Sequence, residues 1–388
     1  MKMTIQAILT ADNHLNRYYR NMSPDQLERR REFLSRNFEK TVDQAISDKV
    51  DLYLHAGDLF DMPNPRNLPI IKVARRLREL YDEGIRAYMI AGTHDMPKMR
   101  TTYGGSVPQR IFQAQGHANV FTHSDVIETR KVNINGLYVV IGGISTDPIL
   151  ENVDPLVGKK FDEVGDINIL LVHYGIEGHV SYRSKDPVIS RESISKIEAG
   201  CICSGHIHDH RLFKLGEKTI VVPGATERMT FKEKDKTPGF YFLDIDKRDV
   251  NAEFIKLDCQ PMREIEVKVS DLSEDPNDLL FEMVKTSSSA DQLLKLKLRG
   301  TVSRSFYHKL KLHKLFVLGN ELNFNFAIDD GFILESLAED FGGGRLSQKE
   351  EIVNVADLMM QERTEFEKDI LKSARDLVLK MYGGDRDL

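Results

Sequence analysis

The feature that most constrains the fold is a pattern that recurs along the chain: a short apolar run that stops at an aspartate or a histidine. Residues 50–56 form such a run, and Gly57 and Asp58 follow it directly. The run is too short for an amphipathic helix with a 3.6-residue period and predicts a buried strand. Glycine permits a sharp turn where the strand ends. Asp58 is therefore expected at the carboxyl edge of an open α/β sheet, where such sheets bind their ligands.

A single acid after a strand is most simply an ordinary, solvated turn, but the pattern recurs at five predicted strand ends. The strands are expected at residues 5–10, 50–56, 86–91, 167–172 and 199–204, and they lead to Asp12 and His14, Asp58, His94, His173, and His206 and His208. In Asp-x-His and His-x-His, alternate residues of an extended segment point the same way and offer two donors to one centre. Mixed imidazole and carboxylate donors suit manganese, zinc or iron. The set contains more donors than one metal ion with an open coordination position would use, which predicts two metals. Asp58 is the best candidate to bridge them, because a carboxylate has two oxygens.

His94 is interpreted as the catalytic acid beside this metal site. When protonated, it would stabilise the charged transition state or protonate the leaving oxygen. Its neighbour Asp95 is expected to orient the imidazole. The alternatives for His94 are a further metal ligand or a surface histidine.

Composition and charge narrow the class of protein. A chain of 388 residues suggests about two or three domains. Three cysteines, Cys201, Cys203 and Cys259, indicate a reducing compartment and no disulfide framework, and they leave too few thiols for a cysteine-rich zinc site. Cys201 and Cys203 are expected to pack on one face of a strand.

The net charge of −6 shows that the protein as a whole is not a polycation, although a local basic patch can still bind nucleic acid. No apolar run approaches the length of a membrane span, and no signal peptide is apparent.

Capping and turn signals predict the elements between these strands. Ser23 and Gln26 form a capping box that opens an amphipathic helix. Pro63, Pro65 and Pro69 precede a predicted basic helix over 70–81, whose cations either meet phosphate or, more commonly, form a solvated face. Asn135-Gly136 predicts a tight hairpin. A second hairpin is expected over 212–222, and closing strands over 239–246 and 252–257.

Beyond about residue 261 the pattern predicts a small α/β region and a helical tail. Strands are expected at 265–269, 293–298 and 315–317, with helices at 276–286 and 306–310. The triple glycine at 342–344 predicts a flexible joint. A capping box that starts at Ser347 opens a predicted long helix. Its apolar positions fall along one face: Ile352, Val355, Met359, Phe366, Ile370, Leu377 and Met381.

The strand-end motifs resemble those of the calcineurin-like metallophosphoesterases. The motifs are Asp12-Asn13-His14, Gly57-Asp58-Leu59-Phe60-Asp61, Gly92-Thr93-His94-Asp95, His173 and Gly205-His206-Ile207-His208. More narrowly, they resemble the SbcD family of DNA double-strand-break repair nucleases, as do residues 223–228, Phe231, Glu233 and Gly239-Phe240. The resemblance covers most of the chain and is weakest over 101–165 and after 344.

This resemblance implies an α/β fold built as a four-layer α-β-β-α sandwich with two Mn²⁺ ions, Mg²⁺ or another divalent ion being possible. Carried over by position, Asp12, His14 and His208 would hold one metal, Asp58 would bridge, and His173 and His206 would hold the second. His94 would be the catalytic histidine. The implied domains are a nuclease domain over 1–258, a DNA-orienting cap over 259–335, and a linker with a helical tail over 336–388.

One position departs from the family pattern. The family has asparagine where this chain has Thr93, and that asparagine would give its carbonyl oxygen to the second metal. The shorter threonine hydroxyl is a poorer neutral donor. Two metals per chain are still expected, with a water in place of the missing ligand or a weaker second site.

The resemblance also implies partners. The family forms homodimers through the phosphoesterase domain and docks its C-terminal helices on an SbcC-type coiled-coil ATPase. The stripe of Ile352, Val355, Met359, Phe366 and Ile370 fits that role, the alternative being a helix folded back on its own core. Arg17, Arg20 and Lys232 are candidate contacts for DNA phosphates, although simple solvation explains any one of them. DNA binding would then be backbone-directed and salt-sensitive.

The leading function is therefore a metal-dependent DNA exonuclease or endonuclease in double-strand-break repair, expected in the cytoplasm at the nucleoid and not in a membrane. One alternative is a phosphatase or phosphodiesterase that acts on nucleotides or proteins. The other is a weakly catalytic DNA-tethering scaffold, which Thr93 keeps open.

Overall fold

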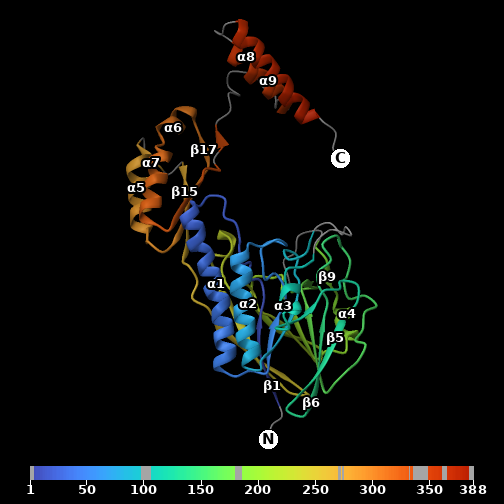
Figure 1. Cartoon of the computed structure of the whole chain (residues 1–388). Coiled ribbons are helices and arrows are strands. Elements are labelled where there is room, and N and C mark those ends of the chain that lie inside the picture. The colour runs from blue at the N-terminus through green and yellow to red at the C-terminus, as the bar shows by residue number, and fades with distance from the viewer. Residues whose placement is uncertain are drawn as a thin grey trace. The chain divides into compact units, whose positions relative to one another are not determined.

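The computed structural model describes residues 4–97, 106–179, 186–269, 272, 275–331, 333–334, 348–360 and 365–383 (Figure 1). The chain divides into two compact units. The first comprises Met1–Val267, Asn277–Lys297 and Lys311–Asp330, and the second comprises Lys268–Pro276, Leu298–Leu310 and Gly331–Leu388.

Two six-stranded sheets form the centre of the first unit. One sheet has the order β14-β13-β1-β2-β3-β4 and the other β11-β12-β10-β7-β6-β5. The first contains β1 Ile5–Thr10, β2 Leu52–His55, β3 Arg86–Ile90, β4 Asn119–Phe121, β13 Gly239–Ile245 and β14 Val250–Lys256. The second contains β5 Glu128–Ile134, β6 Leu137–Gly143, β7 Ile167–Val172, β10 Cys201–Ser204, β11 Arg211–Leu215 and β12 Lys218–Val222. The strands that end in candidate ligands are parallel within each sheet, so their carboxyl ends reach one edge.

The inner faces of the two sheets share one apolar core. Leu9, Leu54 and Ile90 from the first sheet pack in the same cluster as Ile141 and Leu171 from the second. Cys201 and Cys203 also lie in this cluster, with their sulfurs 3.8 Å apart, which confirms that they share one face of the strand.

Helices cover the outer faces, so the predicted four-layer α-β-β-α sandwich is confirmed. α1 (Pro24–Ser47), α2 (Asn67–Asp82) and α3 (Arg110–Ala114) lie on the first sheet, and α4 (Arg191–Lys196) on the second. α1 begins with the predicted capping box, in which Ser23 and Gln26 bond each other's backbone N–H groups.

α2 begins earlier than predicted, at Asn67 rather than after Pro69. A proline in the first turn of a helix loses no intrahelical hydrogen bond, so Pro69 does not delay the start. Lys72 pairs with Glu32, Arg76 with Asp43 and Glu79, and Arg78 with Asp82. These cations therefore belong to a solvated, ion-paired face, the commoner of the two predicted interpretations.

Both predicted hairpins are confirmed. Asn135 and Gly136 have φ values of 51° and 83°, as a type I′ turn between β5 and β6 requires. The second hairpin joins β11 and β12, and the predicted closing strands are β13 and β14.

The small α/β region contains a three-stranded sheet of β15 (Met262–Lys268), β16 (Leu293–Arg299) and β18 (Asn325–Asp329), with α5 (Pro276–Ser287) and α7 (Leu312–Leu322). The predicted strand at 315–317 is wrong, because these residues lie inside α7. A three-residue apolar run carries no period that separates strand from helix. Leu315 and Gly319, one helical turn apart, are buried, and Gly319 packs on Phe326 of β18. The second unit holds β17 (Thr301–Val302), α6 (Arg304–Lys309) and β19 (Ile333–Leu334).

The tail also differs from prediction. Its described part contains two helices, α8 (Gln348–Met360) and α9 (Glu365–Gly383), which contact each other. Arg375 lies 3.4 Å from Asp357, whereas 18 residues of one straight helix would separate them by about 27 Å. The prediction of a single long helix is therefore wrong. An apolar stripe alone does not reveal where one helix ends and the chain turns back into a second. Ser347 and the triple glycine lie outside the described residues. No described helix is long and apolar enough to cross a bilayer.

Candidate metal centre

The turns after β1 and β2 run side by side and are joined through their backbones. The Asp12 N–H donates to the Gly57 carbonyl at 3.0 Å, and the His14 N–H donates to the Asp58 carbonyl at 3.1 Å. Asp12, His14, Asp58 and His206 all have positive φ values, of 51°, 45°, 54° and 80°. Non-glycine residues seldom adopt this region, and such strain gathers at functional sites. The fold therefore holds these side chains in orientations that an unconstrained turn would not favour.

Two glycines permit the close approach of these turns. A Cβ atom at Gly92 would lie 2.2 Å from Asp58 Oδ1, and one at Gly205 would lie 2.2 Å from the Ala56 carbonyl. Larger residues at either position would displace Asp58 or the end of β2.

Three groups of donor atoms converge in this space. The groups are Asp12 with His14 and His208, His14 with Asp58 and His94, and Asp12 with Asp58 and His173. Within each group one ligand atom per residue lies within 4.8 Å of the others.

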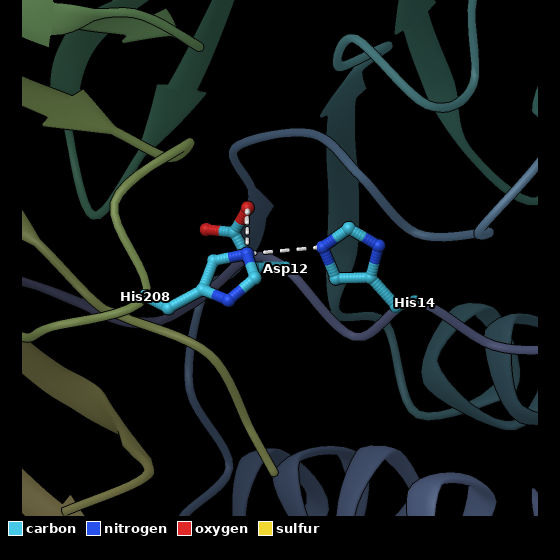
Figure 2. A group of neighbouring side chains, drawn as sticks. All are labelled: Asp12, His14 and His208. Atoms are coloured by element: carbon cyan, nitrogen blue, oxygen red, sulfur yellow. Dashed lines mark hydrogen bonds and ion pairs between the residues drawn. The ribbon is translucent and has the colours of Figure 1, made fainter. Parts of the chain in front are cut away.

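Figure 2 shows the first group, in which one ring nitrogen of His208 faces both the Asp12 carboxylate and the His14 ring. The Nε2 atoms of His14 and His208 are 3.1 Å apart, and His208 Nε2 is 3.9 Å from Asp12 Oδ1. Two imidazole nitrogens that face each other cannot both donate a proton, whereas both can bind one cation. This donor set fits a divalent metal.

His173 and His206 also lie close to Asp12. His173 Nε2 is 3.2 Å from Asp58 Oδ2, and its Nδ1 donates to the Ala56 carbonyl at 2.7 Å. The His206 ring lies 5.4 Å from the His173 ring, centroid to centroid, and the His206 backbone N–H donates to the Asp12 carboxylate. His206 is not in any of the three groups found among the described residues, although it borders them. Thr93 is exposed in the turn after β3.

His94 belongs to one of the three donor groups, and the residue that hydrogen-bonds its ring is Asp61. The His94 side chain is 45% exposed, and its Nδ1 donates to the Asp61 carbonyl oxygen at 3.2 Å. The Asp61 carboxylate also accepts from His14 Nδ1 at 3.1 Å and from Arg17 at 2.6 Å.

The orienting role predicted for Asp95 is therefore wrong. Its buried carboxylate accepts the backbone N–H groups of Leu59, Phe60 and Gly92, which ties the turns after β2 and β3 together. Burial and the Asp58 charge raise the pKa of Asp95 to about 7. The prediction relied on Asp95 following His94 in the sequence. In the structure the Asp95 side chain is buried and the His94 side chain is exposed, so the two point in different directions.

Comparison with known proteins agrees with this geometry. A family model described as calcineurin-like phosphoesterase matches residues 6–210, which is more than half of the chain. The chain belongs to the calcineurin-like phosphoesterase family. It is thus an enzyme of the phosphoester-hydrolysing class, and the divalent metal that this family uses fits the donor set described above.

The curated relatives of this phosphoesterase include proteins named DNA double-strand break repair protein Mre11. The one from Sulfolobus acidocaldarius is 25% identical over 77% of this chain and 76% of its own length. The one from Methanocaldococcus jannaschii is 25% identical over 66% of this chain and 68% of its own length. Among solved structures, TT1561 of Thermus thermophilus matches 65% of this chain and 99% of its own, with a TM-score of 0.37 and 13% identity.

Three residues that support the phosphoesterase centre are named in the sequence motifs, but no role is predicted for them from the sequence. Asp61 stands three positions after Asp58 in the same motif, which was its only signal. Glu233 bonds His208 Nδ1 at 3.0 Å, and its sole local signal is the capping box with Thr230. Asn13 bonds His55 Nε2 at 2.6 Å and Thr226 at 3.0 Å, which links the first ligand turn to the end of β2. Such partners fix the orientation of metal-ligating imidazoles.

The three predicted DNA contacts differ in exposure. Arg17 is partly buried and bonded to Asp61, whereas Arg20 and Lys232 are exposed.

The electrostatics of the metal-free phosphoesterase show what a metal must displace. Burial opposes charge on both Asp58 and His173, yet their mutual attraction prevails. The pKa of Asp58 is lowered by the His173 and His14 charges, while the Asp58 and Asp12 carboxylates raise the pKa of His173 to about 9. His173 is thus protonated near neutral pH when no metal is bound.

We expect Mn²⁺ binding to release a proton from His173 and to tighten as the pH rises towards about 9. Because one proton competes with the metal, the apparent affinity should increase by up to about tenfold per pH unit in that range. In the metal-free protein the same ion pair contributes stability that is fully present below 6.5, the ordinary pKa of a histidine, and is lost as the pH rises through about 9. Calorimetric titration with Mn²⁺ at pH 7 and 8, in buffers of different ionisation enthalpy, measures the affinity and the proton release, and urea unfolding of the metal-free protein at several pH values measures the stability. An affinity independent of pH would contradict this expectation.

Replacing Asp61 with asparagine should lower hydrolysis by roughly 10–100-fold, the scale on which partners of metal ligands act. The change removes the carboxylate charge that orients His14 and binds Arg17. Steady-state kinetics with Mn²⁺ measure the loss, and Asp48→Asn, at the exposed end of α1, is the control. Equal activity of the two variants would exclude this role for Asp61.

Proposed function

We propose that this phosphoesterase is a metal-dependent DNA nuclease of double-strand-break repair that hydrolyses phosphodiester bonds. The observation that carries the proposal is the convergence of three donor groups, one of which includes the half-exposed His94. The curated relatives that match most of the chain are named as DNA double-strand break repair proteins, which favours DNA as the substrate.

The proposed ligand assignment takes the first donor group as one site and combines His173 with the neighbouring His206 as the other. Asp12, His14 and His208 would hold one Mn²⁺, His173 and His206 would hold a second, and Asp58 would be shared by both. When bound, two such ions would supply a hydroxide nucleophile and would stabilise charge on the phosphoryl oxygens. Asp58 Oδ2 lies 3.7 Å from His14 Nε2 and 3.2 Å from His173 Nε2, which suits a bridge between the two sides.

His94 acts on the leaving group in this proposal. Its Nδ1–H is held by the Asp61 carbonyl, so its Nε2 remains for a substrate oxygen. The His94 backbone N–H donates to Asp58 Oδ1 at 2.8 Å, which ties the position of the acid to the bridging carboxylate. A protonated His94 then gives its Nε2 proton to the departing oxygen.

The remaining parts of the chain have proposed roles in handling DNA. Residues 259–335 serve as a cap that orients DNA, and Arg17, Arg20 and Lys232 contact its phosphates. Gln26 at the start of α1 donates a hydrogen bond to the Phe324 carbonyl. This bond connects the proposed cap to the sandwich within the first unit.

We further propose that residues 336–388 dock on a coiled-coil ATPase of the SbcC type, that the chain forms a homodimer, and that it works at the nucleoid. Val355, Met359 and Ile370 of α8 and α9 are about half exposed, which supports a docking role for the tail.

A cleavage assay tests this function. Plasmid and hairpin oligonucleotides are incubated with Mn²⁺, with Mg²⁺ or with EDTA, using wild-type protein and His94→Ala, with and without the ATPase. We expect Mn²⁺-dependent cleavage that falls by roughly 10²–10⁴-fold in the variant, the contribution of a positioned general acid. Wild-type protein that binds DNA but is as inert as His94→Ala would favour a tethering scaffold. Cleavage of nucleotides or phosphoproteins in place of DNA would favour a different phosphoesterase.

Introducing asparagine at Thr93 should strengthen the second metal site. The amide would provide the neutral oxygen that threonine supplies poorly, and we expect roughly tenfold tighter binding of the second Mn²⁺. Titration calorimetry measures both sites, and Thr93→Val, which has no oxygen donor, is the matched control. Identical second-site affinities in Thr93→Asn and wild type would refute the expectation.

A further inference from the structure

His55, the last residue of β2, is fully buried and takes no part in the mechanism proposed above. Its Nδ1 accepts a hydrogen bond from the backbone N–H of Gly57 at 3.3 Å, and its Nε2 lies 2.6 Å from Asn13 Oδ1. Asn13 is fully buried as well, and its Nδ2 donates to the hydroxyl oxygen of Thr226 at 3.0 Å. The His55 ring therefore connects the turn after β2 to the turn after β1, in which Asn13 lies.

The direction of each hydrogen bond in this connection is fixed by the backbone. A backbone N–H can only donate, so the Nδ1 atom that accepts from Gly57 carries no proton. A neutral imidazole has one N–H, which is then at Nε2 and donates to Asn13 Oδ1. Burial lowers the pKa of His55 to about 3, so the ring stays neutral. Each donor in the connection thus faces an acceptor, and the Asn13 amide is held in one orientation.

Together with the backbone, these bonds form a closed ring between the two ligand turns. Gly57 accepts the Asp12 backbone N–H on its carbonyl oxygen at 3.0 Å. It is also joined to the first turn through its own N–H, His55 and Asn13. A shift of either turn would break a bond of the ring and leave a buried polar group without its partner, which is costly. The ring thus fixes the first turn relative to Asp58, which follows Gly57.

The first turn needs such a support because its backbone is strained. Asp12 and His14, on either side of Asn13, have φ values of 51° and 45°, a region that residues other than glycine seldom adopt. Strained residues of this kind persist only where the surrounding structure imposes their conformation. The Asn13 side chain is held by both His55 and Thr226, so it anchors the middle of the turn. Without that anchor the turn can relax, and the donor atoms of Asp12 and His14 then separate.

We propose that His55 is a positioning residue of the metal centre, which acts through Asn13 to hold the donor atoms of Asp12 and His14 in place before a divalent ion binds. The inference rests on the proposed ligand assignment and adds to it a residue that contacts neither ion nor substrate. Donors that are already in place do not have to be ordered when the ion binds, so the connection raises the affinity for the metal. Partners of metal ligands change metal affinity by roughly 10–100-fold.

Calorimetric titration of the metal-free protein with Mn²⁺ tests the role of His55. His55→Phe keeps a flat ring in the same space but removes both hydrogen bonds, and we expect its Mn²⁺ affinity to fall by roughly 10–100-fold. His55→Gln offers an amide N–H near the position of Nε2 and should recover most of the affinity. The inference fails if His55→Phe binds Mn²⁺ as tightly as wild type, or if His55→Gln binds it as weakly as His55→Phe.

Tyr53→Phe is the matched control, because it also removes a hydrogen bond from a fully buried side chain of β2. The Tyr53 hydroxyl lies 2.7 Å from the Thr41 hydroxyl, in the apolar cluster between the first sheet and α1. Urea unfolding in EDTA should show that both variants are less stable than wild type, whereas only His55→Phe should bind Mn²⁺ more weakly. An equal loss of Mn²⁺ affinity in the two variants would identify general destabilisation as the cause and would overturn the inference.

A double variant tests whether His55 acts through Asn13. Asn13→Ala leaves β2 unchanged and should weaken Mn²⁺ binding about as much as His55→Phe does, so it tests the same connection even if His55→Phe does not fold. If the two residues act as one unit, Asn13→Ala/His55→Phe should bind Mn²⁺ within about twofold of the weaker single variant. Losses that multiply would show two independent effects and would contradict the proposed connection.

Kinetics separate failure of this inference from failure of the proposed function. In the hydrolysis of bis(p-nitrophenyl) phosphate, His55→Phe should need roughly 10–100-fold more Mn²⁺ for half-maximal activity, with a kcat at saturating Mn²⁺ close to that of wild type. Wild-type protein that binds Mn²⁺ but cleaves no DNA would refute the nuclease function alone. An active wild type with the same Mn²⁺ requirement as His55→Phe would refute the positioning role alone.

Discussion

Replacing Asp58 with asparagine is expected to abolish Mn²⁺-dependent hydrolysis while the sandwich remains folded. The Asp58 carboxylate is the group that faces both sides of the centre, since it lies near His14 and near His173. Asparagine retains one oxygen for the His94 backbone N–H, which donates to Oδ1 at 2.8 Å. It also tolerates the positive φ of 54° at this position better than most residues. What disappears is the negative charge that two cations would share.

The loss should be at least about 10²–10³-fold, the range for removing one group that stabilises transition-state charge. Hydrolysis of bis(p-nitrophenyl) phosphate measures it, and calorimetric titration should show weakened Mn²⁺ binding. Circular dichroism tests whether the fold survives. Asp82→Asn, which alters an exposed carboxylate at the end of α2, should behave as wild type. Substantial Mn²⁺-dependent turnover in Asp58→Asn would exclude a bridging role.

Replacing Arg30 with methionine is expected to destabilise the protein by about 3–5 kcal/mol, the cost of leaving a buried charge without its partner. Arg30 and Glu227 are both fully buried, and their closest charged atoms are 3.5 Å apart. Arg30 also donates to Gln260 at 3.0 Å and to the Arg228 carbonyl. It thus ties α1 to the segment after β12, whose continuation supplies Glu233 to the metal centre.

Urea unfolding followed by circular dichroism measures this effect. Arg36→Met, on an exposed part of α1, should change stability by no more than about 0.5 kcal/mol. The double variant Arg30→Met/Glu227→Gln should recover part of the loss, because it no longer buries an unpaired carboxylate. If Arg30→Met proves no more destabilising than Arg36→Met, the ion pair does not stabilise the fold.

Much of the framework could be predicted because its signals are local. The capping box at Ser23, the Asn135-Gly136 turn and the strand that ends before His173 each depend on a few neighbouring residues. Errors occurred where a local signal was ambiguous. The apolar run at 315–317 is part of α7, and the apolar stripe of the tail is divided between α8 and α9, which fold back on each other.

The sequence by itself determined which residues stand at the ends of the central strands. A short apolar run and the turn residues that end it are local features, so they can be recognised from neighbouring residues alone. Only the tertiary structure decided which of these residues meet. It placed Asp61, rather than Asp95, beside His94, and it supplied Glu233 to His208 from 25 residues further along the chain. It also brought Arg31 of α1 to the carbonyl oxygen of Arg17, whose guanidinium bonds Asp61. The physical reason is that side-chain partners depend on how strands and turns are stacked in space, and no short-range pattern encodes that stacking.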